Sequence, residues 1–221
     1  METLELKKVS IVLRSIIEYF LDNRSHILAE VDVLFSQYGI KSITMDDIAK
    51  QLGMSKKTIY QHFKDKNELV LELMRTKIDA QIGIIQEGRD KASNAIHEMF
   101  FGIANLEAML SKTNPSMFYD LQKFYPQAWA YFKDFRERIL LEKIRDNIVW
   151  GVQEGYYRSE VDVDILSIMR VEQIEFSFNQ FVFPLQRFSV LQVAKELTLH
   201  FIYGICTSKG YELTKQYEQA H

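Results

Sequence analysis

The sequence holds little of what cross-links or interrupts a chain. Its 221 residues include one cysteine, Cys206, three prolines and nine glycines. A lone cysteine excludes an intramolecular disulfide and a cysteine-based zinc site, and it suits the reducing conditions of the cytoplasm. With so few helix breakers, and with alternating β-branched runs scarce, we expect an all-α, cytoplasmic protein of one or two domains.

A strong net charge and a membrane-spanning run are also missing. The formal charge is −3, and 47% hydrophobic with 26% charged residues is an ordinary globular composition. The most apolar N-terminal stretch, residues 9–21, is interrupted by Arg14, lacks a small-residue cleavage site and is too short to cross a bilayer. We therefore expect neither export nor membrane insertion, and we interpret residues 1–24 as an additional helix without an assigned role.

Motifs of catalysis are absent as well. The sequence has no Gly-rich phosphate loop, no H-E-x-x-H and no G-x-S-x-G. Glu172 and Glu175 fall on one helix face but without partner histidines, and His97 and His200 are interpreted as ordinary buried or solvated side chains. We expect a protein that is not an enzyme and that has no cofactor and no metal site.

Residues 43–66, ITMDDIAKQLGMSKKTIYQHFKDK, carry two short helical patterns that meet at a sharp turn. Thr44 and Asp47 have the spacing of a capping box, which predicts the start of the first helix. Gly53 supplies the turn, because a residue without Cβ adopts a positive φ at little cost. The apolar face of this first helix consists of Met45, Ile48, Ala49 and Leu52.

The second helix of the motif starts at Ser55, and only Ile59 and Phe63 are strongly apolar within it. The remaining side chains are expected to face outward as a surface suited to a DNA groove: Lys56, Lys57, Thr58, Tyr60, Gln61 and His62. Residues 41–66 contain six lysines against three aspartates, a local excess of +3 on a chain of net charge −3. Such a patch attracts phosphate at one surface only.

Apolar periodicity predicts helices through the rest of the chain. A support helix is expected over 24–38, a linking helix from Asp65 to a break within 86–94, and a body of helices from Ala95 onward. Later helices are expected over 127–154, over 163–183 and over 190–206, followed by a polar tail that frays. The segment 163–183 is apolar on more than one side, so it needs burial on two fronts.

The N-terminal motif resembles the DNA-binding signature of the tetracycline-repressor (TetR) family of bacterial transcription regulators, and residues 43–70, ITMDDIAKQLGMSKKTIYQHFKDKNELV, carry the resemblance. It implies a three-helix DNA-binding domain with a helix-turn-helix over residues 25–70. It further implies a larger helical ligand-binding and dimerisation domain over 71–221, whose last two long helices form a four-helix dimer bundle.

The resemblance also implies the contacts with double-stranded DNA. Phosphates would be held by Thr44, Thr58, Tyr60 and Lys66, while Lys56, Lys57, Gln61 and His62 would face base edges. Ser55, at the start of the recognition helix, belongs to the same candidate DNA-binding set.

The body is rich in large soft side chains that either line an apolar pocket or form plain core. The candidate ligand-binding residues are Phe101, Asn105, Met109, Phe118, Phe124, Tyr125, Trp129, Phe132, Met169, Gln173 and Phe176. One copy of the DNA-binding domain contacts too few phosphates for specificity, so we expect a homodimer on a palindromic operator.

The predicted function is a ligand-responsive transcriptional regulator, a repressor released from its operator by a small, mainly apolar effector of unknown identity. Two alternatives stay open within this class, an activator and a regulator without an effector. A helical carrier or enzyme that has lost DNA binding is the alternative from another class.

Overall fold

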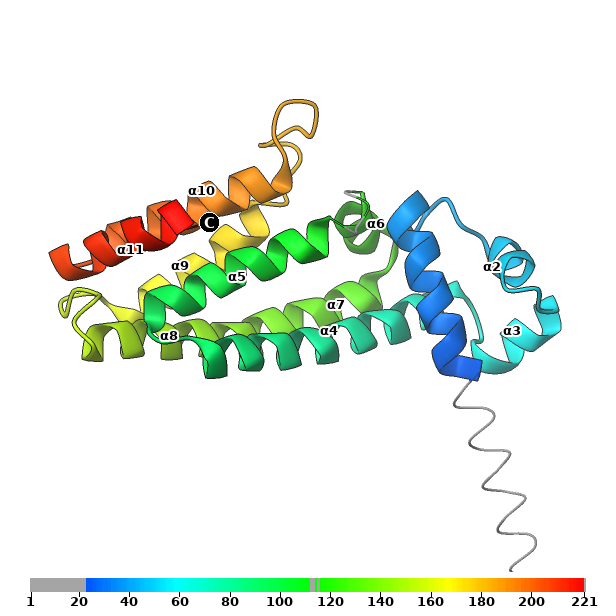
Figure 1. Cartoon of the computed structure of the whole chain (residues 1–221). Helices are drawn as coiled ribbons and strands as arrows, with labels where there is room; N and C mark the ends of the chain where they lie inside the picture. Colours follow the sequence, from blue (N-terminus) through cyan, green and yellow to red (C-terminus); the bar gives the residue numbers. More distant parts are fainter. Residues whose placement is uncertain (1–22, 112–113, 115, 221) are drawn as a thin grey trace, which may run out of the picture.

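The computed structural model describes residues 23–111, 114 and 116–220, and these are helical with a single isolated β-bridge between Tyr157 and Cys206 (Figure 1). The all-α prediction is therefore confirmed. Most of the expected extra helix over residues 1–24 lies outside the described residues. None of the described helices is long and apolar enough to cross a membrane.

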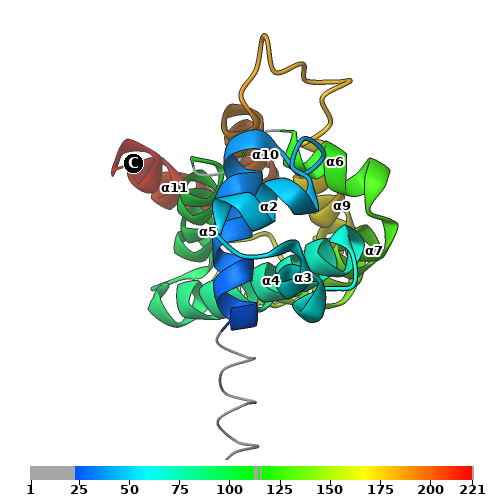
Figure 2. The same ribbon diagram turned by 90° about the vertical axis from the view of Figure 1, so that its right-hand side faces the viewer.

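The DNA-binding end is formed by the first described helix (residues 23–38) with α2 (Met45–Gln51) and α3 (Lys56–His62). Its core consists of side chains from all three helices, including Ile27, Phe35, Ile48, Ile59 and Phe63, none of which is exposed. Figure 2 looks onto this end of the molecule, with α2 and α3 in front of the body.

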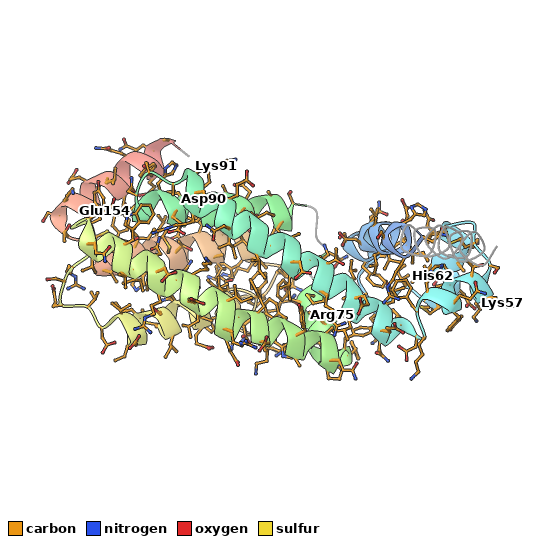
Figure 3. The ribbon with its side chains drawn as sticks, turned by 90° about the horizontal axis from the view of Figure 1, so that it is seen from below. Lys57, His62, Arg75, Asp90, Lys91 and Glu154 are labelled. Carbon is orange, nitrogen blue, oxygen red and sulfur yellow. The ribbon has the colours of Figure 1, made fainter. Side chains whose placement is uncertain are left out.

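Helix α4 (Lys66–Lys91) runs from the DNA-binding end along the body. Asp65 caps it, since its side chain accepts a 2.9 Å hydrogen bond from the backbone N–H of Glu68. The helix continues past Gly88, so the break expected within 86–94 is confined to residues 92–94. Helix α4, which carries Arg75 (Figure 3), packs against α7. The Arg75 guanidinium lies over the ring of Tyr131, 5.6 Å from its centroid.

The body continues with helices at the predicted places. They are α5 (Ala95–Leu110), α6 (Met117–Phe124), α7 (Pro126–Asp134), the π-helical turn η1 (Phe135–Leu140) and α8 (Leu141–Gln153). The single helix expected over 127–154 is thus continuous but contains a π-helical turn in its middle. Gly155, with a φ of +73°, follows the end of α8, next to the expected boundary at residue 154.

The segment after this helix differs from the prediction. Helix α9 (Val163–Phe176) stops seven residues before Phe183, and residues 177–189 form turns up to α10 (Val190–Ile205). The hydroxyl of Ser177 donates to the carbonyl of Ile174, which satisfies one of the last carbonyls of α9. Hydrophobicity alone did not mark this end, because the aromatic run continues into the loop.

The expected frayed tail is helix α11 (Ser208–Ala220), so that prediction was wrong. Tyr217 accounts for the difference, because its ring stacks on His97 at 4.8 Å and its hydroxyl accepts a 3.0 Å hydrogen bond from the side-chain amide of Asn94. Gly210 lets α11 approach the preceding loop, since a Cβ there would lie 2.1 Å from the carbonyl oxygen of Tyr156.

Two apolar cores are present. One lies around α5, α8, α9 and α10, with Ile148, Tyr157 and Ile202 at its centre. The other combines the DNA-binding helices with α6 and α7, because Leu121 and Tyr125 pack among the same side chains as Phe35 and Phe63. The DNA-binding helices therefore share a core with part of the body.

Candidate DNA-binding surface and ligand cavities

The turn between α2 and α3 has the local structure that its sequence predicts. The Thr44 hydroxyl accepts from the backbone N–H of Asp47 at 3.2 Å, and the Asp47 carboxylate accepts from the backbone N–H of Thr44 at 2.8 Å, so the capping box is complete. Gly53 has a φ of +63°. Ser55 caps α3 by accepting a 3.0 Å hydrogen bond from the backbone N–H of Thr58. This local geometry orients α3 across the end of the molecule.

Helix α3 presents a polar face to solvent. Lys56, Lys57, Tyr60 and Gln61 are exposed, with Tyr60 at 44% of its full exposure. Within the described part of the chain, no side chain forms an ion pair with Lys57, which lies at the opposite end of the molecule from Glu154 (Figure 3). An exposed row of ammonium, phenol and amide groups on one helix suits contact with phosphates and base edges.

Lys56 is held differently from Lys57. Its ammonium forms a 2.6 Å ion pair with the carboxylate of Asp46 in α2, and this hydrogen bond raises the pKa of Lys56. The aspartate offsets the lysine charge, so Lys57 is the stronger attractor of phosphate on α3.

His62 does not face outward as expected. Only 7% of it is exposed, and its carbonyl accepts a hydrogen bond of 2.6 Å from Arg24 of the first described helix. Burial, with the nearby Arg24 guanidinium, lowers the pKa of His62. The prediction that this side chain contacts DNA was wrong, since it belongs to the interior of the DNA-binding end.

Lys66 also departs from its predicted role. Its ammonium donates to the carbonyl of Ile40 and lies over the rings of Phe35 and Tyr125, at 5.6 and 5.7 Å from their centroids. Burial lowers the pKa of Lys66, with Asp120 and Asp47 acting in the opposite direction. An ammonium held in this way is directed into the protein, so this structure does not present Lys66 to phosphate and the predicted contact stays a prediction.

The same region joins the DNA-binding end to the body. The buried carboxylate of Asp120 in α6 accepts a 2.9 Å hydrogen bond from the backbone N–H of Lys41, and Asn114 donates to the carbonyl of Gln37 at 3.2 Å. No pattern in the sequence predicts this role for Asp120, because an acidic residue in a short helix is normally solvent-exposed.

Two of the cavities in the described part of the body share a wall. The inner cavity, about 560 Å³, lies between the first described helix, α4, α5, α6 and α7, and Leu28, Leu73 and Met109 are among its lining residues. The outer cavity, about 550 Å³, lies between α6, α7, α9 and the loop after α9. Phe118 and Phe132 line both, and their rings meet edge to face at 5.4 Å.

The predicted ligand-binding residues are divided among these places. Asn105 and Met109 line the inner cavity, Trp129, Met169, Gln173 and Phe176 line the outer one, and Phe118 and Phe132 line both. The other three lie elsewhere. Phe101 stacks on His97 at 4.6 Å, while Phe124 and Tyr125 line a cleft beside Lys64 and Asp65. A ligand-binding role for these three stays a prediction, because composition marks soft aromatic side chains without showing which of them face a cavity.

Sequence reasoning missed Arg136, a charged residue that lines the outer cavity. Only 8% of its side chain is exposed, and its guanidinium pairs with Glu175 and with Glu172, the latter at 3.3 Å. Among the described residues, no group of three or more His, Cys, Asp or Glu side chains is placed to hold a metal ion.

Apolar side chains form an exposed stripe along α9. Ile165 is 63% exposed and Ile168 53%, and Met169 and Phe176 continue the same face. Segment 163–183 is apolar on more than one side, as expected. In a single chain, one of these sides stays exposed to solvent.

Comparison with known proteins matches this geometry to a family. Residues 27–73 match the family described as "Bacterial regulatory proteins, tetR family". The transcriptional repressor KstR2 of Mycobacterium tuberculosis is 26% identical over 147 residues, which are 65% of this chain and 73% of KstR2.

Many solved structures share the fold, including the following two. A transcriptional regulator from Saccharomonospora viridis, solved in complex with choline, superposes with a TM-score of 0.69 at 20% identity, covering 84% of this chain and 98% of that one. FadR from Bacillus subtilis, solved with stearoyl-CoA, gives a TM-score of 0.62 at 17% identity, covering 81% of this chain and 97% of FadR.

The fold and the exposed face of α3 define a DNA-binding transcriptional regulator of the helix-turn-helix class. Within that class, residues 27–73 match the tetR family of bacterial regulatory proteins, and the transcriptional repressor KstR2 is similar over 65% of the chain.

Proposed function

We propose that the protein is a homodimeric repressor that leaves a palindromic operator when a small, mainly apolar effector binds the body. The observation that carries the proposal is the outward face of α3, where Lys57, Tyr60 and Gln61 are exposed next to a complete helix-turn-helix. KstR2, to which the chain is similar, is a transcriptional repressor.

The remaining residues of the candidate DNA-binding set have proposed roles. The hydroxyls of Thr44, Thr58 and Tyr60 contact phosphates and set the register on the duplex. Base edges are read by Lys56, Lys57 and Gln61. The charge of Lys56 is offset by its ion pair with Asp46, whereas the charge of Lys57 is not offset by an ion pair with any described residue. Ser55 orients the helix through its cap. Residues 25–70 would form the DNA-binding domain and residues 71–221 the ligand-binding and dimerisation domain.

The homodimer is supported by the exposed stripe on α9. Two copies that cover Ile165 and Ile168 against each other remove apolar surface from water, which stabilises association. A two-fold dimer places two α3 helices in successive major grooves about 34–36 Å apart, so the operator would be palindromic.

The effector is proposed to occupy the cavities of the body. The inner cavity is lined by Leu28 of the first described helix and by Leu73 of α4, which both pack in the core of the DNA-binding end. A ligand that favours one position of these helices changes the separation of the two α3 helices and shifts the population away from the DNA-bound state.

Fluorescence anisotropy with the DNA upstream of the protein's own gene tests the proposal. We expect one palindromic site to bind two chains, at least about a hundredfold more tightly than scrambled DNA of equal length at about 0.15 M salt. Equal affinity for the two DNAs would rule the proposal out. Transcripts of neighbouring genes should rise in a deletion strain, since a fall would indicate an activator.

A further inference from the structure

The outer cavity combines an aromatic wall with an excess of negative charge. The rings of Phe118 and Phe178 stack at 4.1 Å, Phe118 meets Phe132 edge to face, and Trp129 lies 5.2 Å from Phe132. These four rings form one continuous surface along the cavity, which we call the aromatic wall. The faces of aromatic rings carry partial negative charge and attract cations.

The charged residues that line the outer cavity also favour a cationic ligand. Arg136 is its one cation, and Glu172 and Glu175 are its two anions. The guanidinium already pairs with both carboxylates and, at 3.5 Å, with Glu137. Only the buried Nε of Arg136 is left for an anionic ligand, which would also face the two carboxylates, whereas a cation gains from their surplus charge.

A polar acceptor also lacks a partner at this place. Gln173 lines the cavity, and its side-chain oxygen is buried with no hydrogen-bond partner among the described residues. A buried acceptor without a donor is costly, so a ligand that presents an N–H or a positive charge to it is favoured.

We infer that the outer cavity binds an organic cation, whose charge lies against Glu172 and Glu175 and whose apolar part lies on the aromatic wall. This inference rests on the proposed ligand response and adds a charge to an effector that is otherwise mainly apolar. A volume of about 550 Å³ suits a small molecule of this kind.

Three probes with the same phenylpropyl group test the charge preference: phenylpropyl-trimethylammonium, phenylpropanol and phenylpropanoate. Binding is measured by calorimetry on the full chain without DNA. We expect the ammonium to bind most tightly, the alcohol less tightly and the carboxylate least. Equal or tighter binding of phenylpropanoate, or binding of none of the three, would overturn the inference.

Tryptophan fluorescence locates the bound probe. Trp129 is in the aromatic wall, while the other tryptophan, Trp150, packs under the guanidinium of Arg89 at 3.6 Å. In a Trp150→Phe background, the ammonium should change the emission of Trp129 with the same Kd as calorimetry gives. Binding that leaves Trp129 emission unchanged would place the cation elsewhere and refute the site.

Glu172→Gln is the test variant, since the Glu172 side chain is 60% exposed and its replacement leaves the Arg136–Glu175 pair in place. We expect it to weaken ammonium binding about fivefold and to leave phenylpropanol unchanged. Glu142→Gln, at an exposed position of α8, is the matched control and should change neither. Equal effects of the two variants would contradict the assignment.

The outcomes separate this inference from the proposed function. Ammonium binding by a chain that shows no preference for any DNA would support the cation site and overturn the proposed repressor. Specific DNA binding that phenylpropanoate releases would support the repressor and overturn the cation site.

Discussion

The backbone N–H of Lys41 donates a 2.9 Å hydrogen bond to the carboxylate of Asp120, which connects the turn before α2 to α6 of the body. Asp120 is buried, and a Cβ on the neighbouring Gly39 would lie only 3.4 Å from the same carboxylate oxygen. Gly39 itself has a φ of +80°, so the chain turns there in a conformation that favours glycine. The contact therefore depends on the backbone conformation of Gly39 as well as on the side chain of Asp120.

Asp120→Ala should destabilise the protein by about 1–3 kcal/mol, because it removes the acceptor of a part-buried hydrogen bond. Urea denaturation followed by circular dichroism measures the change. Glu196→Ala, at an exposed position of α10, is the control and should shift stability by less than about 0.5 kcal/mol. Equal stability of the two variants would show that the Lys41 contact contributes nothing.

Gly151→Ala should be strongly destabilising, since the added Cβ would lie 2.1 Å from the ring of Tyr157. That ring is fully buried and its hydroxyl donates to Asn147 at 3.3 Å, so it has no free space to move into. We expect a loss of about 1–3 kcal/mol or more in thermal or urea denaturation.

Gly102→Ala serves as the matched control within a helix. Gly102 is exposed in α5 and has no atom near its absent Cβ. The substitution should stabilise by about 0.5–1 kcal/mol, because alanine favours the helix. We expect the free energy of unfolding to fall in Gly151→Ala and to rise in Gly102→Ala. A rise in both variants would show that the Tyr157 ring moves aside.

Lowering the pH should reduce the folding stability of the DNA-binding end, because His62 becomes protonated. Its pKa is lowered in the folded state, chiefly by burial, so the unfolded chain takes up this proton first as the pH falls. The contribution of neutral His62 is complete above the ordinary value of 6.5 and is lost between there and the lowered folded pKa.

Urea midpoints at about pH 7.5 and about pH 5.5 measure this loss in the unaltered protein and in His62→Gln. The variant should show a smaller difference between the two conditions, whereas His26→Gln, at an exposed position of the first described helix, should keep the full difference. An unchanged pH dependence in His62→Gln would mean that other groups cause it.

Variants of Lys57 and Lys66 should separate effects on DNA binding from effects on folding stability. Lys57→Ala should weaken operator binding by about 1–3 kcal/mol and alter base preference, with no change in melting temperature, because this side chain is exposed. Lys66→Ala should lower the melting temperature, since its ammonium bonds to the Ile40 carbonyl inside the protein. Anisotropy titration and thermal denaturation of both variants give the answer, and the reverse pattern would restore Lys66 as a phosphate contact.

Local chemistry determined the parts of this protein that the sequence predicted well. The capping box of Thr44 and Asp47, the positive φ of Gly53 and the cap at Ser55 involve residues at most a few positions apart. Backbone hydrogen bonds and φ preferences act over that range, so the helix-turn-helix and most helix boundaries follow from sequence alone.

Only the tertiary structure decided the contacts that join distant segments. Arg24 and His62 are 38 residues apart in the sequence, and Lys41 and Asp120 are 79 apart. No periodicity within either segment therefore predicts that these residues are in contact. The inward positions of His62 and Lys66, the docking of α11 through Tyr217, and the guanidinium of Arg136 in the outer cavity all depend on which helices pack together. Packing is a property of the whole chain, because each buried polar group must find its partner wherever the fold brings one.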